Sequence, residues 1–246
     1  MKRLIRYFGV SAVVAGLILS AAQSQAVVFS GNGNTGFGGA IGTGSLTLVD
    51  NGTTISGTIT RGSGDFNDAL VIYIDSVGGG FSSTSTFDDT GDGLRKAISG
   101  FDGSNRSALT FDSGFSPDYV LAIGPNNASF GGLWSLAGTG SHGFIASLSL
   151  SPTGTGTAAS YSFSFLVSDI GLTPNSGATF GLLGTYISDS GFRSTEAVAG
   201  NVSGTQGWNA FTQTATASYT IVPEPTTFGL VGIGVLGAWF IRRRKV

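Results

Sequence analysis

Cysteine is absent from this sequence of 246 residues, and histidine and methionine occur once each. Without cysteine the chain has neither a disulfide framework nor a thiolate zinc site. Its stability must therefore come from a packed core. About 196 residues lie between the two hydrophobic ends of the chain, and this length is enough to bury a core as a single domain.

Positive charge is scarce outside the two ends. Seven of the twelve Lys and Arg residues lie among the first six and last five positions, which leaves five in the body against thirteen acidic residues and a net charge of −8. A surface so poor in cations does not attract phosphate backbones. The charge balance therefore excludes nucleic acid binding.

The residues that usually cover exposed helix faces are also scarce. Glu196 and Lys96 are the sole glutamate and lysine of the body, whereas glycine accounts for 41 residues of the chain. This composition disfavours helices. Aromatic and serine residues alternate from Tyr161 to Phe165, a pattern typical of a half-buried antiparallel strand, and Asp50-Asn51-Gly52 is a good hairpin turn. We expect an all-β fold, a single antiparallel, jelly-roll-like β-sandwich over residues 27–221.

Short β-branched or alternating runs, separated by Gly, Asn, Asp and Ser, predict the strands. A helical turn is expected at 168–172, ended by Pro174, and the absence of a long repeat argues against a solenoid or propeller. The Gly-rich segment 31–44 is either a loose arm or a loop that crosses the sandwich. The predicted strands are Ser45–Val49, Thr53–Thr60, Ala69–Asp75, Ala108–Phe111, Tyr119–Ile123, Gly143–Leu150, Ala159–Val167, Ala178–Ile187 and Thr214–Val222.

The C-terminal end has three parts in order. Pro223-Glu224-Pro225 is held extended by its prolines. The fourteen uncharged residues Phe228 to Ile241 follow. As a helix they reach roughly 21 Å, which can span a bilayer core of about 30 Å with help from flanking residues. The chain ends on a basic stop that should stay cytoplasmic, so we predict a transmembrane helix with the upstream chain outside. The basic residues are Arg242, Arg243, Arg244 and Lys245.

This three-part segment, residues 222–246, resembles the PEP-CTERM sorting domain. The resemblance implies that a membrane-embedded exosortase recognises the segment and cuts near Pro223-Glu224-Pro225, in Gram-negative bacteria that make exopolysaccharide. The alternative is a plain C-terminal anchor with a chance Pro-Glu-Pro sequence.

The N-terminal 26 residues have the pattern of a signal peptide. Lys2, Arg3 and Arg6 precede an apolar stretch from Phe8 to Leu19, and Ser24-Gln25-Ala26 offers small residues to signal peptidase. We predict a signal helix that is removed after Ala26, because twelve apolar residues are too few to remain as a second membrane helix. The two ends together predict export, anchoring in the inner membrane by the C-terminus before processing, and then a cell-surface or extracellular location.

Residues suited to catalysis are few. His142 stands in Gly140-Ser141-His142-Gly143, where two glycines are expected to leave it without the support that a catalytic base needs. An ordinary loop histidine is the expected role. Most acids are aspartates in turn-like contexts, which usually bond to the backbone. We therefore predict no catalytic residue and a protein that is not an enzyme. The turn aspartates include Asp65, Asp102, Asp112 and Asp118.

One acidic cluster is denser than the rest. The alternate oxygens of Asp88, Thr90 and Asp92 before Gly93 match the start of a calcium loop. Ser99 stands where an EF-hand has its bidentate glutamate, which excludes an EF-hand. Two alternatives remain, a calcium site on a β-sandwich turn and a solvated turn, and no other cofactor is expected.

Aromatic side chains offer flat faces on which sugar rings stack. Trp208, in Gln206-Gly207-Trp208-Asn209, has a loop-like polar context and is a candidate glycan contact. Trp134 is a second candidate, although its apolar neighbours favour a place in the core.

Three short sequence segments of the body are similar to DOMON-like and family 9 carbohydrate-binding β-sandwich modules. They are residues 68–75, 118–123 and 192–197, and they include no diagnostic ligand motif and no Met/His haem pair. The resemblance implies a β-sandwich that binds sugar.

Three functions remain open after the sequence is read. The first is an exported, non-enzymatic surface or matrix protein, sorted by its tail and in contact with exopolysaccharide. The second is a self-associating structural surface protein without a ligand. The third is a secreted hydrolase with an unrecognised site.

Overall fold

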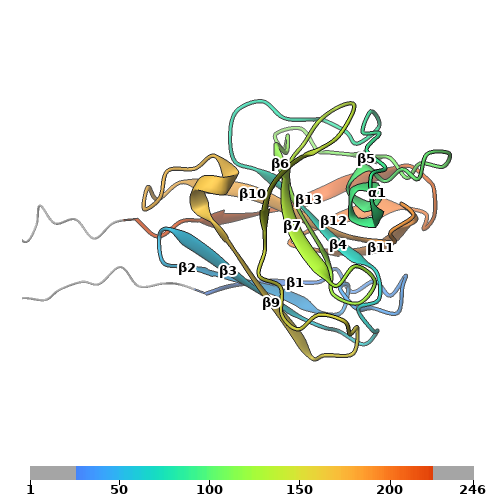
Figure 1. Ribbon diagram of the computed structural model, residues 1–246, viewed down its shortest axis with the longest axis horizontal. Coiled ribbons are helices and arrows are strands. Elements are labelled where there is room, and N and C mark those ends of the chain that lie inside the picture. Colours follow the sequence, from blue (N-terminus) through green and yellow to red (C-terminus); the bar gives the residue numbers. More distant parts are fainter. Residues whose placement is uncertain (1–25, 224–246) are drawn as a thin grey trace, which may run out of the picture. The chain divides into compact units, whose positions relative to one another are not determined.

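The computed structural model describes residues 26–223, which form two sheets (Figure 1). The expected signal helix, the transmembrane helix and most of the sorting segment lie outside the described residues. The smaller sheet has the order β1-β2-β3-β9. Its strands are β1 (Val27–Ser30), β2 (Ser45–Asp50), β3 (Thr54–Thr60) and β9 (Ser160–Leu166).

The larger sheet has the order β12-β13-β10-β4-β6-β7-β8, with β11 paired to β10 and β5 paired to β13. All pairs are antiparallel except β5 with β13. Its strands are β4 (Ala69–Asp75), β5 (Leu109–Thr110), β6 (Tyr119–Gly124), β7 (Phe130–Ser135), β8 (Gly143–Ser147), β10 (Thr179–Ile187), β11 (Arg193–Val198), β12 (Gly200–Gly204) and β13 (Phe211–Thr220).

Strand β4 shows how the core is divided. Leu70, Ile72 and Ile74 share one hydrophobic cluster with buried residues of the smaller sheet. The alternate residues of β4, which include Val71 and Tyr73, point to the opposite face and join a second cluster beneath helix α1 (Gly93–Ser99). Because β4 is covered on both faces, its sequence is a continuous apolar run rather than an alternation. The expected all-β, sandwich-like fold is confirmed for residues 26–223.

The strand predictions were best where period-two patterns are long. Strands β2, β3, β4, β5, β6, β9 and β10 agree with the prediction within one residue at each end. The single helical turn is also confirmed as the 3₁₀ segment η1 (Val167–Ile170), which ends at Gly171 in the left-handed region, φ 72°, before Pro174 is reached. Predicted strands that differ more are β8, which is shorter, and β13, which begins at Phe211.

Five elements were missed by the sequence reading, and helix α1 is the most important of them. Its first turn is capped by Asp92, whose side chain accepts a hydrogen bond from the Arg95 N–H, and it ends at Gly100 in the left-handed region. Seven residues are too few for a helical period to stand out. The other missed elements are β1, β7, β11 and β12.

The Gly-rich segment 31–44 is an ordered loop that crosses from the smaller sheet to β11. Gly31 bridges to Val198, and the fully buried Glu196 carboxylate accepts four backbone N–H groups of the loop at 2.6–3.0 Å. The loose-arm alternative is therefore wrong. The four donors belong to Phe37, Gly39, Ile41 and Gly42.

The two ends of the described body lie close to the same hairpin turn. Val27 pairs with Leu48, and Asp50, two residues further on, accepts hydrogen bonds from the Val222 N–H at 3.1 Å and the Tyr219 hydroxyl at 2.7 Å. Figure 1 shows both chain ends leaving at this end of the sandwich. No helix within residues 26–223 is long and apolar enough to cross a bilayer.

Candidate functional site

Three aromatic side chains gather on the outer face of the β7–β8 hairpin. Phe130 and Trp134 lie on the same face of β7, and Phe144 of β8 pairs directly with Trp134. The ring centroids of Trp134 and Phe144 are 5.7 Å apart, and Phe130 lies 6.4 Å from each. These three residues are called the aromatic trio below. Trp134 is 2% exposed, whereas Phe130 and Phe144 are 36% and 51% exposed.

Gly132 makes room for the trio. It lies between Phe130 and Trp134 on the same face of β7, and a Cβ built there would stand 2.5 Å from Cη2 of the Trp134 ring. A real Cβ does not approach another atom so closely, so the indole lies flat across this glycine only because the side chain is missing.

A hollow of about 360 Å³ lies between two members of the aromatic trio, Phe130 and Trp134, and the start of α1. This volume is at the lower end of the range for small-molecule sites, roughly 300–1,000 Å³. The Trp134 Nε1–H is buried and has no hydrogen-bond partner among the described residues. Such an unpaired buried donor costs free energy. The lining residues are Asp92, Gly93, Leu94, Asn127, Ala128, Phe130, Trp134 and Asp189.

The polar wall of the hollow is acidic. Asp92 caps α1 and pairs with the Arg95 guanidinium, with Oδ2 to Nε at 3.1 Å. Asp189, in the turn between β10 and β11, is exposed and makes no hydrogen bond or ion pair within residues 26–223. Asn127 supplies an exposed amide. The hollow therefore joins aromatic faces to the unpaired carboxylate of Asp189 and to the exposed amide of Asn127, whose Oδ1 also accepts the Ala128 N–H at 2.9 Å.

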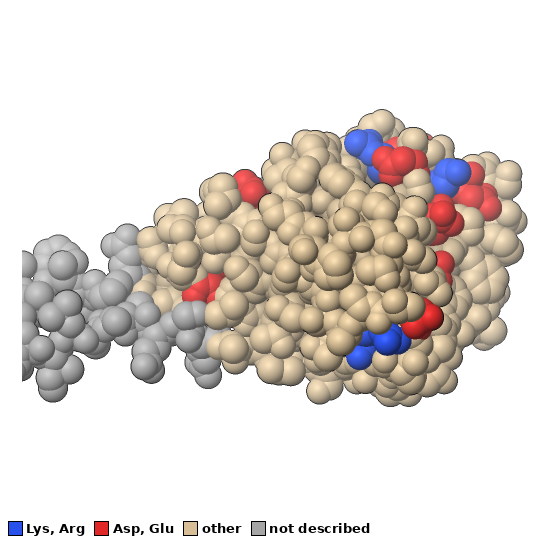
Figure 2. All heavy atoms as spheres, turned by 60° about the horizontal axis from the view of Figure 1, so that its bottom comes forward, with Lys and Arg blue, Asp and Glu red and all other residues tan. Residues whose placement is uncertain are grey.

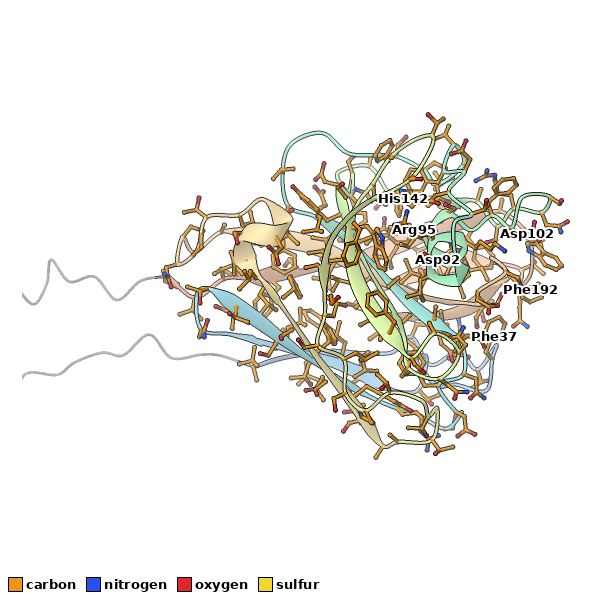
Figure 3. All side chains as sticks on the ribbon, in the orientation of Figure 1. Phe37, Asp92, Arg95, Asp102, His142 and Phe192 are labelled. Carbon is orange, nitrogen blue, oxygen red and sulfur yellow. The ribbon has the colours of Figure 1, made fainter. Side chains whose placement is uncertain are left out.

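Trp208 stands beside this hollow. It is 43% exposed, its ring packs edge-on against Phe192 with centroids 5.0 Å apart, and its Nε1–H donates to the Ser190 carbonyl at 3.4 Å. Ser190 directly follows Asp189, which lines the hollow. The Trp208 indole is therefore hydrogen-bonded to the residue next to the wall of the hollow. Figure 3 shows Phe192 and Phe37, which stack at 6.0 Å, at the end of the sandwich away from the chain ends.

The cluster predicted to bind calcium is engaged by protein donors. Asp88 accepts the Gly140 N–H at 2.5 Å, Asp92 caps α1, and the buried Asp89 accepts the His142 N–H at 2.8 Å and Arg95 Nη1 at 3.0 Å. Burial opposes ionisation of Asp89, but the amides of Gly91 and His142 and the Arg95 guanidinium outweigh it, so its pKa lies below the ordinary value. Within residues 26–223 no three His, Asp or Glu side chains are placed to hold a metal ion. Calcium binding at Asp88, Thr90 and Asp92 stays a prediction.

His142 is well supported, contrary to the expectation drawn from its glycine neighbours. It is 1% exposed, Nδ1 accepts the Ala137 N–H at 3.1 Å, and Nε2 lies 3.2 Å from the Ser99 hydroxyl. Since Nδ1 accepts, Nε2 carries the proton and donates to Ser99, the wrong direction for activating a serine. Burial lowers the pKa of His142 to about 4, so it is neutral at neutral pH.

The turn aspartates mostly bond to the backbone, as predicted. Asp102 accepts the N–H groups of Ser104 and Asn105 at 2.7 and 2.6 Å, and these bonds lower its pKa. Asp112 and Asp118 also accept backbone N–H groups. Asp65 differs, because its carboxylate pairs with Arg61 at 3.1 Å.

The sequence reading found Trp134 and Trp208 but missed their surroundings. The prediction that Trp134 packs in the core is confirmed, and Trp208 is exposed. Phe130, Phe144 and Asp189 come from three separate segments, and only β pairing brings them together. The sequence carried one signal of this site. Gly132 stands two residues before Trp134, so in a strand the glycine and the large ring lie on the same face.

The sorting and cleavage residues lie at or beyond the limits of the described body. Ala26 is exposed directly before β1, and Pro223 is exposed after Val222. Glu224, Pro225 and the basic stop lie outside the described residues. On the face drawn in Figure 2, the Lys and Arg side chains gather at the end of the body away from Ala26 and Pro223.

Comparison with known proteins identifies the C-terminal segment. The family model of the PEP-CTERM protein-sorting motif matches residues 222–245. No curated protein and no solved structure matches the chain. The resemblance of the body to DOMON-like and family 9 carbohydrate-binding modules is thus not confirmed, whereas the sorting motif is. Residues 222–245 are thus a PEP-CTERM protein-sorting motif, which implies export, sorting by an exosortase and association of the C-terminal tail with the membrane before processing.

Proposed function

We propose that this protein is a non-enzymatic cell-surface or matrix protein that binds exopolysaccharide through the hollow beside the aromatic trio. One observation carries the proposal: the partly exposed Phe130 ring and the Trp134 ring border a hollow of about 360 Å³ whose wall offers the free Asp189 carboxylate and the Asn127 amide. Sugars present an apolar C–H face to aromatic rings and hydroxyl groups to such acceptors.

Trp208 is proposed as a second contact for the same ligand. It approaches the rim through the adjacent residues Asp189 and Ser190, and consecutive Cα atoms are about 3.8 Å apart. A polymer of several sugar units would contact both the hollow and the exposed indole. Signal peptidase acting after Ala26 completes the proposed processing.

The absence of catalysis is proposed from the chemistry of the candidate residues. The buried His142 donates toward Ser99 and is neutral at neutral pH. The carboxylates of turn aspartates such as Asp102 and Asp112 accept hydrogen bonds from backbone N–H groups. Turnover of chromogenic glycosides or esters by the purified protein would support the hydrolase alternative instead.

The proposal is tested by binding of the full-length protein to a panel of polysaccharides, in a detergent without a sugar headgroup. Phe144→Ala and Trp208→Ala should each weaken retention about three- to tenfold, the effect of losing roughly 1 kcal/mol of stacking. Leu166→Ala is the matched control, because Leu166 is an equally exposed apolar residue, at 49%, on the smaller sheet.

Equal retention by the control and both aromatic variants would contradict the proposal. So would the absence of retention on every polysaccharide tested. A self-associating protein without a ligand is the second candidate, favoured by Val28, which is 62% exposed on the edge strand β1. Concentration-dependent assembly in sedimentation, abolished by Val28→Lys, would support that candidate.

A further inference from the structure

We propose that the hollow selects sugars that carry a protonated amine over neutral and acidic sugars. This inference rests on the proposed function and concerns the chemical class of its ligand. The geometry points to an amino-sugar unit whose ring stacks on the aromatic trio while its ammonium group faces Asp189.

The first support is the charge of the wall. Asp189 is exposed and unpaired within the described body, and Asp92 stands on the same wall. An ammonium group would find in Asp189 a carboxylate that no protein cation already occupies. A uronic acid would bring a second negative charge toward it.

The second support is that the nearby cation is already occupied. Arg95 pairs with Asp89 and Asp92 and also donates to the His142 carbonyl. Its guanidinium is thus held by two carboxylates and offers little to an anionic ligand. Arg61 and Arg106 donate to backbone carbonyls elsewhere, and Arg193 is fully buried.

The third support is the aromatic wall itself. A cation within about 6 Å of an aromatic ring is attracted by the negative face of the ring. Phe130 lines the hollow and leaves part of its ring exposed, so an ammonium group there has both a carboxylate and a π face as partners. The negative charge of Asp189 also reaches Asp68, where it adds to burial in raising the pKa.

The test compares two glucosamine oligosaccharides of equal length, one N-acetylated and one with free amines, together with an oligouronate. Full-length protein is titrated at mildly acidic pH and low salt, where the amines are charged. We expect the free-amine oligosaccharide to bind about fivefold tighter than the acetylated one and the oligouronate to bind most weakly. High salt should remove the difference.

Asp189→Asn isolates the charge, because this side chain has no hydrogen bond within the described body to lose. It should abolish the preference for the free amine, and any hydrogen bond to a sugar hydroxyl that is lost with the carboxylate should weaken the acetylated and free-amine oligosaccharides alike. Asp112→Asn, an exposed aspartate in another loop, should keep the preference.

The outcomes separate the two proposals. Equal affinity of the wild-type protein for the acetylated and free-amine forms, or a preference that survives in Asp189→Asn, overturns this inference and leaves exopolysaccharide binding intact. Failure of all three oligosaccharides and of every polysaccharide in the panel overturns the proposed function as well.

Discussion

Glu196 is the residue on which the Gly-rich loop depends. Its buried carboxylate accepts four backbone N–H groups from residues 37–42, and hydrogen bonds to a charged acceptor contribute about 1.5–3 kcal/mol each. No local sequence pattern predicted that Glu196 binds this loop, because the carboxylate and its donors lie more than 150 residues apart in the sequence.

Glu196→Gln should therefore destabilise the protein strongly. The new amide group would point N–H donors at the N–H groups of Ile41 and Gly42, so we expect the free energy of unfolding to fall by about 3 kcal/mol. Urea denaturation measures the change, with Asp112→Asn as an exposed acid-to-amide control. A loss below about 0.5 kcal/mol would show that the carboxylate does not hold the loop.

His142 makes stability depend on pH. Its pKa is about 4 in the folded protein because of burial, and about 6.5 in the unfolded chain. Between these values the unfolded state binds the proton and the folded state does not, so stability should fall by about 3 kcal/mol as the pH drops from 6.5 to 4. Nearby Asp88, Asp89 and Arg95 modify this pKa.

The contribution of His142 is isolated by the variant His142→Asn. Denaturation measured across this pH range should give the variant a shallower loss of stability than the wild type, since all carboxylates titrate in both proteins. Parallel pH profiles would contradict a neutral, buried histidine.

At the scale of single residues, the sequence predicted the roles of side chains that depend on residues adjacent in the sequence. The backbone-bonded Asp102 and the buried Trp134 follow from adjacent residues. The support of His142 was predicted wrongly, because its partners Ser99 and Phe87 come from distant segments. The site around Asp189 was missed for the same reason.

Among the elements, β7 decides whether the hollow exists. Gly132→Ala would place a methyl group 2.5 Å from the Trp134 ring, which forces the indole to move. We expect a loss of stability of about 1–3 kcal/mol and weaker polysaccharide retention. Gly131→Ala is the matched control, since its Cβ would meet Leu148 at 3.4 Å, an ordinary contact. Equal behaviour of the two variants would contradict the described packing of β7.

The turn that leads into α1 should not need calcium for its stability. Its three aspartates already accept hydrogen bonds from Gly140, His142 and Arg95. We expect dialysis against a chelator to leave the melting temperature unchanged. A drop that added calcium reverses would instead support the calcium site predicted at Asp88, Thr90 and Asp92.

Strands with long alternation were predictable, and short elements were not. The Tyr161–Phe165 pattern identified β9 because every second residue is aromatic and enters the core between the sheets. Strand β7 was missed because Gly131 and Gly132 interrupt its apolar pattern, and α1 because it spans only two turns. Both elements line the hollow, so the functional surface lies where the sequence signal was weakest.

In the whole molecule, the folded body continues up to the sorting motif. The Asp50 carboxylate accepts a hydrogen bond from the Val222 N–H. The family match begins at Val222. The candidate ligand surface near Phe192 lies at the end of the body away from Ala26 and Pro223 (Figure 3). The ends that carry the processing signals are thus separated from the surface proposed to bind polysaccharide.

The most direct test is the intact mass of the protein recovered from fractions of cells that possess an exosortase. We predict a surface or extracellular species that begins at Val27 and lacks the apolar run 228–241, and a variant without residues 224–246 that is exported but not sorted. Recovery of the unprocessed 246-residue chain from the cytosol would contradict the account.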